Sequence, residues 1–363
     1  MNRLRSKLEL ALIATAFLTA CGTPGVPLPP SLELARPVND LRAVRKGAQV
    51  FLTWSAPTET TDRHNIRKGG PTEICRSMDT AMDECGSPVA KLAFEKALGV
   101  KNGSRKREMS YTDQLPRNLQ VEHATSNLSY AVSVLNPYGR SAGLSNQVQV
   151  PAAPTLAPPA DFKAQLTADG VQLRWGPVPA TAEISGIRYA YRIYRREQKT
   201  NKDSLAAEVP VGSESSGALD RGFEWEKTYD YRATVVTFIA QAGVMDQQVE
   251  GDDTASVRVV AHDVFPPKTP SGLQAVFSGP GQKPFIDLVW SPNGESDLAG
   301  YNVYRHEQGG QAAKLNSEIV KAPVFRDNAV LPGRQYFYSI TAVDVPGNES
   351  RRSEEATETV PAQ

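Results

Sequence analysis

A repeat of domain length constrains this chain more than any other feature of its sequence. Each copy has an early Pro, then an apolar alternation that ends in a Trp, with a further Pro within three residues of that Trp. The three tryptophans are Trp54, Trp175 and Trp290, which lie 121 and 115 residues apart. Solenoid repeats are far shorter, at about 20–50 residues, and a chain of 363 residues suits two or three domains. The repeat therefore predicts three homologous domains in tandem.

Each copy also contains segments in which aromatic or β-branched residues alternate with other residues. Such an alternation indicates strands with one buried face. The segments run from Leu128 to Val134, from Ile187 to Ile193, from Tyr229 to Val235 and from Tyr336 to Ala342. With 27 Gly and 27 Pro the chain favours turns over long helices, and its best helix candidate, Ser77–Cys85, is short and polar. We therefore expect an all-β fold built from sandwiches.

These residues resemble the fibronectin type III family, and the third copy matches the family pattern best. In that copy Tyr301–Arg305 matches the motif of the family's third strand. The corner Leu331–Gly333 precedes Tyr336, and the loop Asp344–Ser350 precedes the last strand. The resemblance implies three tandem immunoglobulin-like β-sandwiches, each with two antiparallel sheets packed face to face.

The first copy departs most from the family pattern. Leu128 stands where the corner Tyr is expected, and Cys75 replaces the Tyr of the Tyr-Arg pair. Its Trp54 lies 76 residues before Tyr130, whereas the equivalent spacings in the other copies are 56 and 48 residues. The first copy therefore contains an insertion, which we expect at 58–72 and in part of 77–125.

The resemblance implies structural roles for the shared aromatic residues. Tyr229 and Tyr336 would hydrogen-bond to the backbone at the corner before the sixth strand. Each sandwich core would be anchored by one large inward ring, from Trp54, Trp175 and Trp290. A sugar-stacking platform at these positions is the weaker alternative, because the alternation points them inward. Trp225 lies outside the shared pattern and, if it is exposed, is the best single candidate for a binding contact.

The N-terminal segment has the pattern of an export signal. Basic residues precede the apolar run Leu8–Leu18, which is too short to remain as a membrane span. The tetrad Leu18–Cys21 that follows resembles the lipobox of bacterial lipoproteins. That resemblance implies cleavage before Cys21 and lipidation of its sulfur. The alternative is an ordinary signal peptide with a chance Cys near the cut.

The sequence also predicts location and domain order. A lipidated Cys21 would attach the chain to a membrane of the cell envelope, and Gly22 in place of an Asp favours the outer over the inner membrane. The predicted organisation is a signal peptide (1–20), a lipidated tether (21–35) and three fibronectin type III domains (36–151, 156–263 and 266–362).

Cys75 and Cys85 are expected to form a disulfide. Export places them where disulfides persist, and an acylated Cys21 cannot pair with either of them. The bond would close the polar loop between them, provided that the two Cα atoms lie about 4.4–6.8 Å apart. Two free buried thiols are the competing interpretation. A metal pair is less favoured, since a structural site needs about four ligands.

The search for chemistry finds little. The four His are scattered, and no metalloprotease, paired-Cys, Walker or nucleophile-elbow motif occurs. The acidic cluster Glu250–Asp253 could bind Ca²⁺ through its oxygens, but a solvated hairpin loop is the favoured interpretation. We therefore predict no catalytic residue, no metal and no cofactor. The balance of 40 basic against 40 acidic residues also excludes nucleic-acid binding through a dominant basic field.

Two classes of function follow from these expectations. The first is a non-catalytic, lipid-anchored envelope protein whose sandwiches act as a spacer and bind an unidentified protein or glycan. The second is an enzyme or accessory subunit that acts on polysaccharide. Fold alone does not decide between them. An exposed aromatic row on one sheet face would favour glycan binding, and a cleft with two facing carboxylates would favour hydrolysis.

Overall fold

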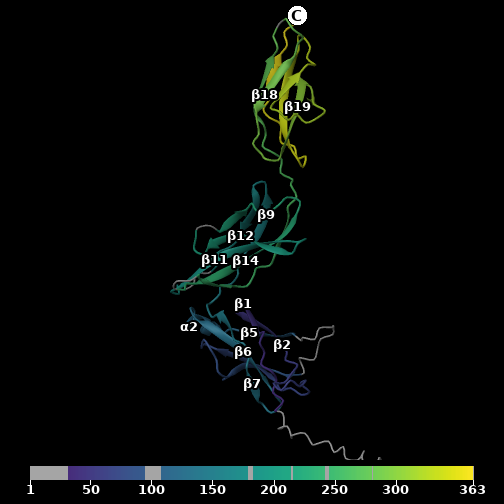
Figure 1. The fold of residues 1–363 in the computed structure, drawn as a ribbon. Helices are drawn as coiled ribbons and strands as arrows, with labels where there is room; N and C mark the ends of the chain where they lie inside the picture. Colours follow the sequence, from purple (N-terminus) through teal and green to yellow (C-terminus); the bar gives the residue numbers. More distant parts are fainter. Residues whose placement is uncertain are drawn as a thin grey trace, which may run out of the picture. The chain divides into compact units, whose positions relative to one another are not determined.

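The computed structural model describes residues 32–94, 108–178, 183–213, 216–241, 245–279 and 281–362. These residues form β-strands and connecting turns, with the six-residue helix α2 (Arg117–Glu122) in the first repeat (Figure 1). The predicted fold class, an all-β chain of tandem sandwiches, is confirmed.

The first sandwich has two sheets with a short helix at one corner. One sheet contains β1 (Arg42–Lys46), β2 (Gln49–Ser55) and β5 (Glu108–Gln114). The other contains β3 (Thr72–Ser77), β4 (Pro88–Leu92), β6 (Asn127–Leu135), β7 (Ser141–Leu144) and β8 (Val148–Pro151). The pairings among these eight strands are antiparallel, as the sandwich pattern requires.

The second sandwich repeats this order of strands. Its smaller sheet contains β9 (Lys163–Thr167), β10 (Gly170–Arg174) and β13 (Gly217–Asp220). Its larger sheet contains β11 (Ile187–Glu197), β12 (Lys202–Pro210), β14 (Thr228–Ile239), β15 (Gln247–Glu250) and β16 (Val257–Val260). The predicted alternations at 187–193 and 229–235 thus lie on β11 and β14.

The third sandwich also has two sheets. One sheet contains β17 (Ser271–Phe277), β18 (Ile286–Ser291) and β21 (Val324–Asp327). The other contains β19 (Leu298–Glu307), β20 (Ala313–Lys314), β22 (Gln335–Asp344) and β23 (Ala356–Thr359). Tyr301, Val303 and Ile340 point from β19 and β22 into the core, and each is at most 1% exposed.

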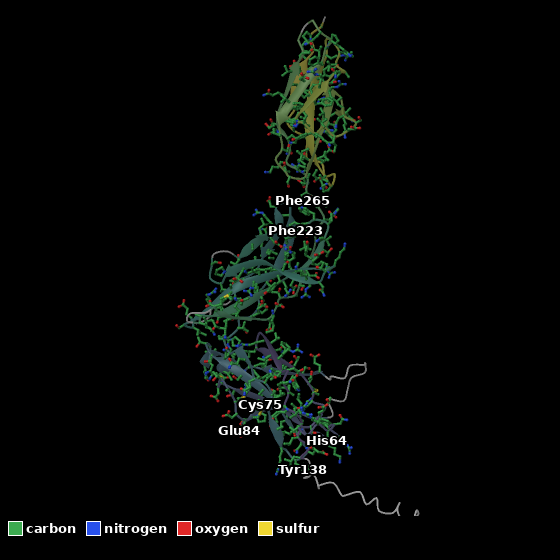
Figure 2. The ribbon with its side chains drawn as sticks, viewed as in Figure 1. His64, Cys75, Glu84, Tyr138, Phe223 and Phe265 are labelled. Carbon is green, nitrogen blue, oxygen red and sulfur yellow. A yellow bond between two sulfur atoms is a disulfide. The ribbon has the colours of Figure 1, made fainter. Side chains whose placement is uncertain are left out.

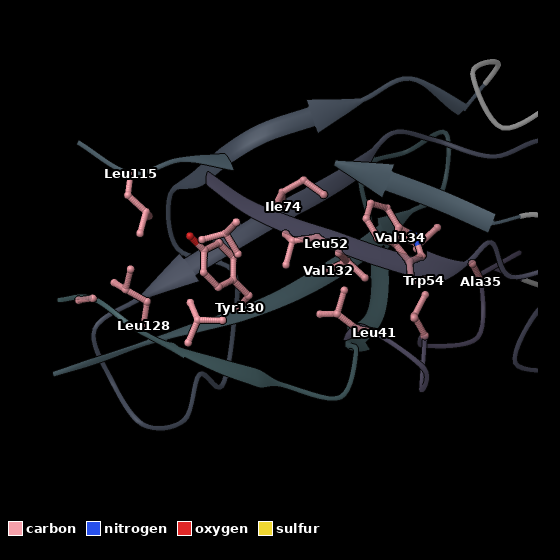
Figure 3. Packing of buried hydrophobic residues seen from close by; sticks show 14 residues of the cluster. Ala35, Leu41, Leu52, Trp54, Ile74, Leu115, Leu128, Tyr130, Val132 and Val134 are labelled. Carbon is pink, nitrogen blue, oxygen red and sulfur yellow. The ribbon is translucent and has the colours of Figure 1, made fainter. Parts of the chain in front are cut away.

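The three repeated tryptophans are buried, as predicted. Trp54, Trp175 and Trp290 have exposed fractions of 1%, 4% and 3%. Figure 3 shows Trp54 at one end of the first core, with Leu52 next to it and Tyr130 farther along the same layer. The weaker interpretation of these rings as an exposed sugar platform is therefore wrong.

The predicted tyrosine corners are present in the second and third sandwiches. The backbone N–H of Glu224 donates to the Tyr229 hydroxyl at 3.0 Å, and that of Leu331 donates to the Tyr336 hydroxyl at 3.0 Å. In the first sandwich Leu128 takes this place and is fully buried. There the connection before β6 contains α2 instead, a helix that the sequence did not predict because six residues are too few for a visible helical period.

The predicted insertion of the first repeat lies at the end where the chain enters the sandwich. Residues 58–71 run beside the first described residues, since the N–H of Thr61 donates to Leu34 O at 2.8 Å. The polar loop between Cys75 and Cys85 forms bends and not a helix. Residues 95–107 lie outside the described part of the chain.

Strand β15 extends a sheet of the first sandwich. Lys46 of β1 pairs in parallel with Glu250 of β15, and their side chains form an ion pair at 2.9 Å. By backbone contacts the chain divides into two compact units, and the first joins the residues up to Ala157 to the end of β14 and to β15. Because this division cuts the second sandwich, the repeat-based domain boundaries stay a prediction.

Candidate functional site

The larger sheet of the third sandwich presents aromatic and charged side chains on its outer face. His306 lies opposite Phe337 on β19 and β22, and Asn302 lies opposite Thr341. Since neighbouring residues of a strand point to opposite faces, these side chains point away from the core residues Val303 and Tyr338. We call this set the aromatic face; it comprises Asn302, Tyr304, His306, Phe337 and Thr341, together with Glu349, Arg352 and Glu355 from the segment that follows β22.

The rings of the aromatic face are partly exposed and held in place. His306 stacks on Phe337, with ring centroids 4.9 Å apart and planes 10° apart. The Arg352 guanidinium lies 4.3 Å from the centroid of the Tyr304 ring, a cation–π arrangement. Tyr304, His306 and Phe337 all have intermediate burial. The face therefore contains a row of partly exposed aromatic rings, and an exposed aromatic row on a sheet face favours glycan binding.

Glu349 forms the centre of the polar part of this face. Its Oε1 accepts hydrogen bonds from Asn302 Nδ2 at 3.0 Å, from the Tyr304 hydroxyl at 2.7 Å and from Thr341 Oγ1. Burial alone would raise the pKa of Glu349, but these donors outweigh it and the pKa is lowered. Burial and the bond to Glu349 raise the pKa of the Tyr304 hydroxyl. At neutral pH Glu349 is thus a fixed anion beside a neutral phenol.

His306 brings a titratable group to the same face. Its Nδ1 lies 2.8 Å from Glu307 O and its Nε2 lies 2.8 Å from Glu355 Oε1. These two acceptors raise the pKa of His306 above its ordinary value. The aromatic face therefore combines apolar ring surface with donors, acceptors and ionised groups, which are the elements that sites for polar organic ligands use.

Three aspartates in the second compact unit lie close enough to hold a metal ion. Carboxylate oxygens of Asp263, Asp297 and Asp344 all lie within 4.8 Å of one another, and oxygen ligands suit Ca²⁺. The carboxylate of Asp344 also accepts bonds from the N–H groups of Gly347 and Asn348, at 2.7 and 2.6 Å. These bonds hold residues 344–347 in a turn, and the Asp344 Oδ2 atom accepts from Asn348 Nδ2 at 2.9 Å, so the carboxylate has protein donors at both oxygens.

Trp225, the predicted binding contact, is half-buried. Its ring meets Phe223 edge-on at 4.9 Å and lies 6.3 Å from the ring of Phe265. Figure 2 labels Phe223 and Phe265, which belong to the end of the second sandwich and to the segment that leaves it. Much of the Trp225 ring therefore serves packing, and its role as a binding contact stays a prediction.

The acidic cluster Glu250–Asp253 is engaged by cations. Glu250 pairs with Lys46 at 2.9 Å, and Asp253 Oδ2 accepts from Arg232 Nε at 3.2 Å. The carboxylates of Glu250 and Asp253 are thus ion-paired with a lysine and an arginine. The arrangement favours the hairpin interpretation over a Ca²⁺ site.

Each sandwich contains a buried Arg–Asp–Tyr triad that the sequence did not predict. In the third, Arg305 Nη1 and the Tyr338 hydroxyl donate to Asp327 Oδ2 at 2.7 and 2.9 Å. The aspartates are only 3–5% exposed. The other two triads are Arg76–Asp113–Tyr130 and Arg195–Asp220–Tyr231. The sequence does contain a pattern that could have indicated the triad: an Asp precedes the buried Tyr by 11 residues in the second and third repeats.

Cys75 and Cys85 are joined by a disulfide, with their Cα atoms 5.4 Å apart. That separation lies within the range set by the sequence prediction. Cys75 directly precedes Arg76, the arginine of the first triad. In the other two sandwiches Tyr194 and Tyr304 directly precede the arginines of their triads. In the first sandwich the disulfide thus occupies the place of the outward tyrosine. The predicted lipidation residue, Cys21, lies outside the described residues.

The described residues contain no helix with the length and apolar character of a membrane span.

The chain is similar to short segments of known enzymes. It is 36% identical over 132 residues to an amylopullulanase of Thermoanaerobacterium saccharolyticum, a match that covers 35% of this chain and 9% of that protein. The amylopullulanase of Thermoanaerobacterium thermosulfurigenes is 36% identical over 124 residues, which cover 34% of this chain and 6% of that protein. The amylopullulanase of Thermoanaerobacter thermohydrosulfuricus is 34% identical over 118 residues, which cover 32% of this chain and 7% of that protein. The chain therefore spans less than a tenth of these relatives. No protein-family model matches it.

The chain is also similar to two solved structures. The FN1–FN3 domains of chicken CNTN1 are 12% identical, cover 90% of this chain and 99% of their own, and have a TM-score of 0.26. An Fn3-like protein from Clostridium thermocellum is 29% identical, covers 27% of this chain and 98% of its own, and has a TM-score of 0.23.

Proposed function

We propose that this chain is a non-catalytic, lipid-anchored accessory protein of the bacterial cell envelope, whose sandwiches bind polysaccharide. The observation that carries the proposal is the size of the match to amylopullulanases. About a third of this chain corresponds to less than a tenth of each enzyme. A shared segment of that size supports an ancillary module that accompanies polysaccharide chemistry and does not perform it.

The aromatic face supports polysaccharide as the ligand. Tyr304 and Phe337 offer ring surface to the apolar faces of sugars, and Glu349 and Arg352 offer hydrogen-bond partners to hydroxyl groups. The ligand would lie across the outer surface of the sheet. The outer membrane is the favoured location, because Gly22 and not Asp follows Cys21.

Affinity electrophoresis tests the ligand. The chain from Cys21 onward should migrate more slowly in gels that contain pullulan or amylose, and Tyr304→Ala with Phe337→Ala should restore the normal mobility. Tyr138→Ala is the matched control, because it removes an aromatic ring from another sandwich. Equal mobility with and without each glucan would contradict polysaccharide binding. Release of reducing sugar by the pure chain would contradict the non-catalytic part.

Fractionation tests the anchor. Cys21→Ser should remove acylation and release the chain from membranes into the soluble fraction. A variant that still fractionates with detergent-soluble lipoproteins would contradict lipidation at Cys21.

A further inference from the structure

The first described residues are attached to the hairpin between β6 and β7. Asn136 Nδ2 donates to Leu32 O at 2.8 Å, so the chain enters the first sandwich beside this hairpin. Tyr138 at the hairpin tip is 85% exposed, and Leu32 is 55% exposed. Figure 2 shows Tyr138 and His64 at the same end of the first sandwich. We call this end the tether end; it comprises Leu32, residues 58–71 and 136–140.

The hairpin holds Tyr138 outward on a fixed turn. Asn136 is 2% exposed, and its Oδ1 accepts from the backbone N–H groups of Tyr138 and Arg140, both at 2.9 Å. Gly139 completes the turn at a φ of +76°, a backbone angle that suits glycine. The turn therefore fixes the exposed position of the Tyr138 ring, because the buried Asn136 side chain binds the backbone at Tyr138 and at Arg140.

The tether end carries several exposed cations. The N–H of Thr60 donates to His64 O at 2.8 Å and closes a turn within residues 58–71. Residues 58–71 contain two acids: Glu59 forms an ion pair with Arg36, and the Asp62 carboxylate lies 3.5 Å from His64 Nδ1. Four further cations are exposed, and none forms an ion pair within the described part of the chain: Arg63, Arg67, Lys68 and Arg140. The tether end therefore has an excess of positive charge.

We propose that the tether end docks on the surface of the bilayer that holds the lipid anchor, with anionic phospholipid headgroups as its ligands. The proposal rests on the proposed lipidation of Cys21. Residues 22–31 join Cys21 to Leu32, which can lie at most about 40 Å apart, so the anchor keeps this end near the bilayer. Tyrosine rings favour the membrane interface, and exposed lysine and arginine are attracted to anionic lipid.

A tryptophan at the hairpin tip reports the docking. The chain from Cys21 onward carries Tyr138→Trp and is coupled through the Cys21 thiol to a maleimide lipid in vesicles of phosphatidylcholine and phosphatidylglycerol. Cys75 and Cys85 are unreactive because they form the disulfide. This coupling replaces cellular lipidation, so failure of docking and failure of the proposed anchor are distinguishable. Val345→Trp is the matched control, since Val345 is 75% exposed on a turn of the third sandwich.

We expect brominated lipid to quench the added fluorescence of Tyr138→Trp at least about two-fold, and that of Val345→Trp by much less. An unquenched tryptophan at position 138, or equal quenching of both variants, would overturn the proposal.

Charge reversal provides a second measurement. Arg63→Glu, Arg67→Glu, Lys68→Glu and Arg140→Glu together should weaken vesicle binding of the Cys21→Ser chain at least about 100-fold, because each cation contributes about five-fold at an anionic surface. Reversal of four exposed cations elsewhere, at Lys199, Lys283, Lys321 and Arg351, should change it by less than about ten-fold. Equal effects of the two sets would contradict docking through the tether end.

Discussion

A buried aspartate binds an arginine and a tyrosine in every sandwich. Burial, and then the bond to aspartate, raises the pKa of Tyr130, Tyr231 and Tyr338 far above the ordinary tyrosine value. The tyrosine therefore stays neutral and donates to the carboxylate, which also balances the charge of the arginine. The alternation of apolar residues could not reveal this triad, because its members are polar and lie on three different strands.

Asp327→Ala should destabilise the third sandwich strongly. The substitution leaves Arg305 partly buried without its carboxylate, and breaking one partner of a buried ion pair costs about 3–5 kcal/mol. Hydrogen exchange of the β22 amides in the full chain measures this free energy of opening. Tyr338→Phe is the control, because it removes one hydrogen bond to a charged group and should cost about 1.5–3 kcal/mol. A cost below 1 kcal/mol for Asp327→Ala would show that solvent replaces the carboxylate.

His306 should make the third sandwich less stable as the pH rises. Its folded pKa is raised by Glu307 O and Glu355. Its protonated form is therefore favoured in the folded state, with the full stabilisation present below the ordinary His pKa of about 6.5. The stabilisation is lost as the pH rises through the folded value. Glu355→Gln should flatten the dependence of β22 amide exchange on pH once intrinsic exchange is corrected. An unchanged slope would contradict the role of this pair.

The loop between β3 and β4 covers the outer face of the first sandwich. Ser129 Oγ donates to Asp79 O at 2.7 Å, and Gln147 exchanges hydrogen bonds with the backbone of Met82. The disulfide closes this loop where the other sandwiches have an outward tyrosine. A covalent link thus replaces the cation–π contacts that Arg232 and Arg352 make over Tyr194 and Tyr304.

Cys75→Ser together with Cys85→Ser should destabilise the first sandwich by about 2–3 kcal/mol, because a loop of this size loses its cross-link in the unfolded chain. Hydrogen exchange of the β6 amides, measured at increasing urea concentrations, gives this loss in the free energy of unfolding. The same change should leave the exchange of β22 unaltered. A reduced wild-type chain as stable as the oxidised one would contradict the prediction.

Strands were predictable where one face is buried, and less so elsewhere. The inward positions of β14 and β22 repeat every second residue, so their alternation was visible. The short strand β15 has no such period, because its place depends on pairing with β14 and β1. The aromatic face was also missed, since His306 and Phe337 meet only through the register of β19 with β22.

Arg45 binds the segment that leaves the first sandwich. It is 8% exposed and donates to Ala153 O at 2.7 Å, to Pro151 O and to Gln120 Oε1 at 3.2 Å. Burial lowers the pKa of Arg45 to about 10. Neutral oxygens thus replace the carboxylate that a buried arginine usually pairs with, and the segment 151–153 becomes part of the first compact unit.

Arg45→Met should loosen this segment without unfolding the sandwich cores. The change leaves buried carbonyl oxygens without donors, and each such loss costs about 1–3 kcal/mol. Proteolysis between β8 and β9 should become at least ten-fold faster. Lys46→Met is the control, because Lys46 is only partly buried and pairs with Glu250 instead. Equal cleavage rates for Arg45→Met and the parent chain would contradict the role of Arg45.

The pairing of β1 with β15 has a consequence for the order of folding. The ion pair between Lys46 and Glu250 joins residues that are 204 positions apart. A chain is synthesised N-terminus first, and domains generally fold as units in that order. The first sandwich therefore keeps an uncovered sheet edge until β15 has emerged, and such an edge can pair with another chain. We therefore expect the first sandwich to associate with other chains more readily before β15 has formed than after it.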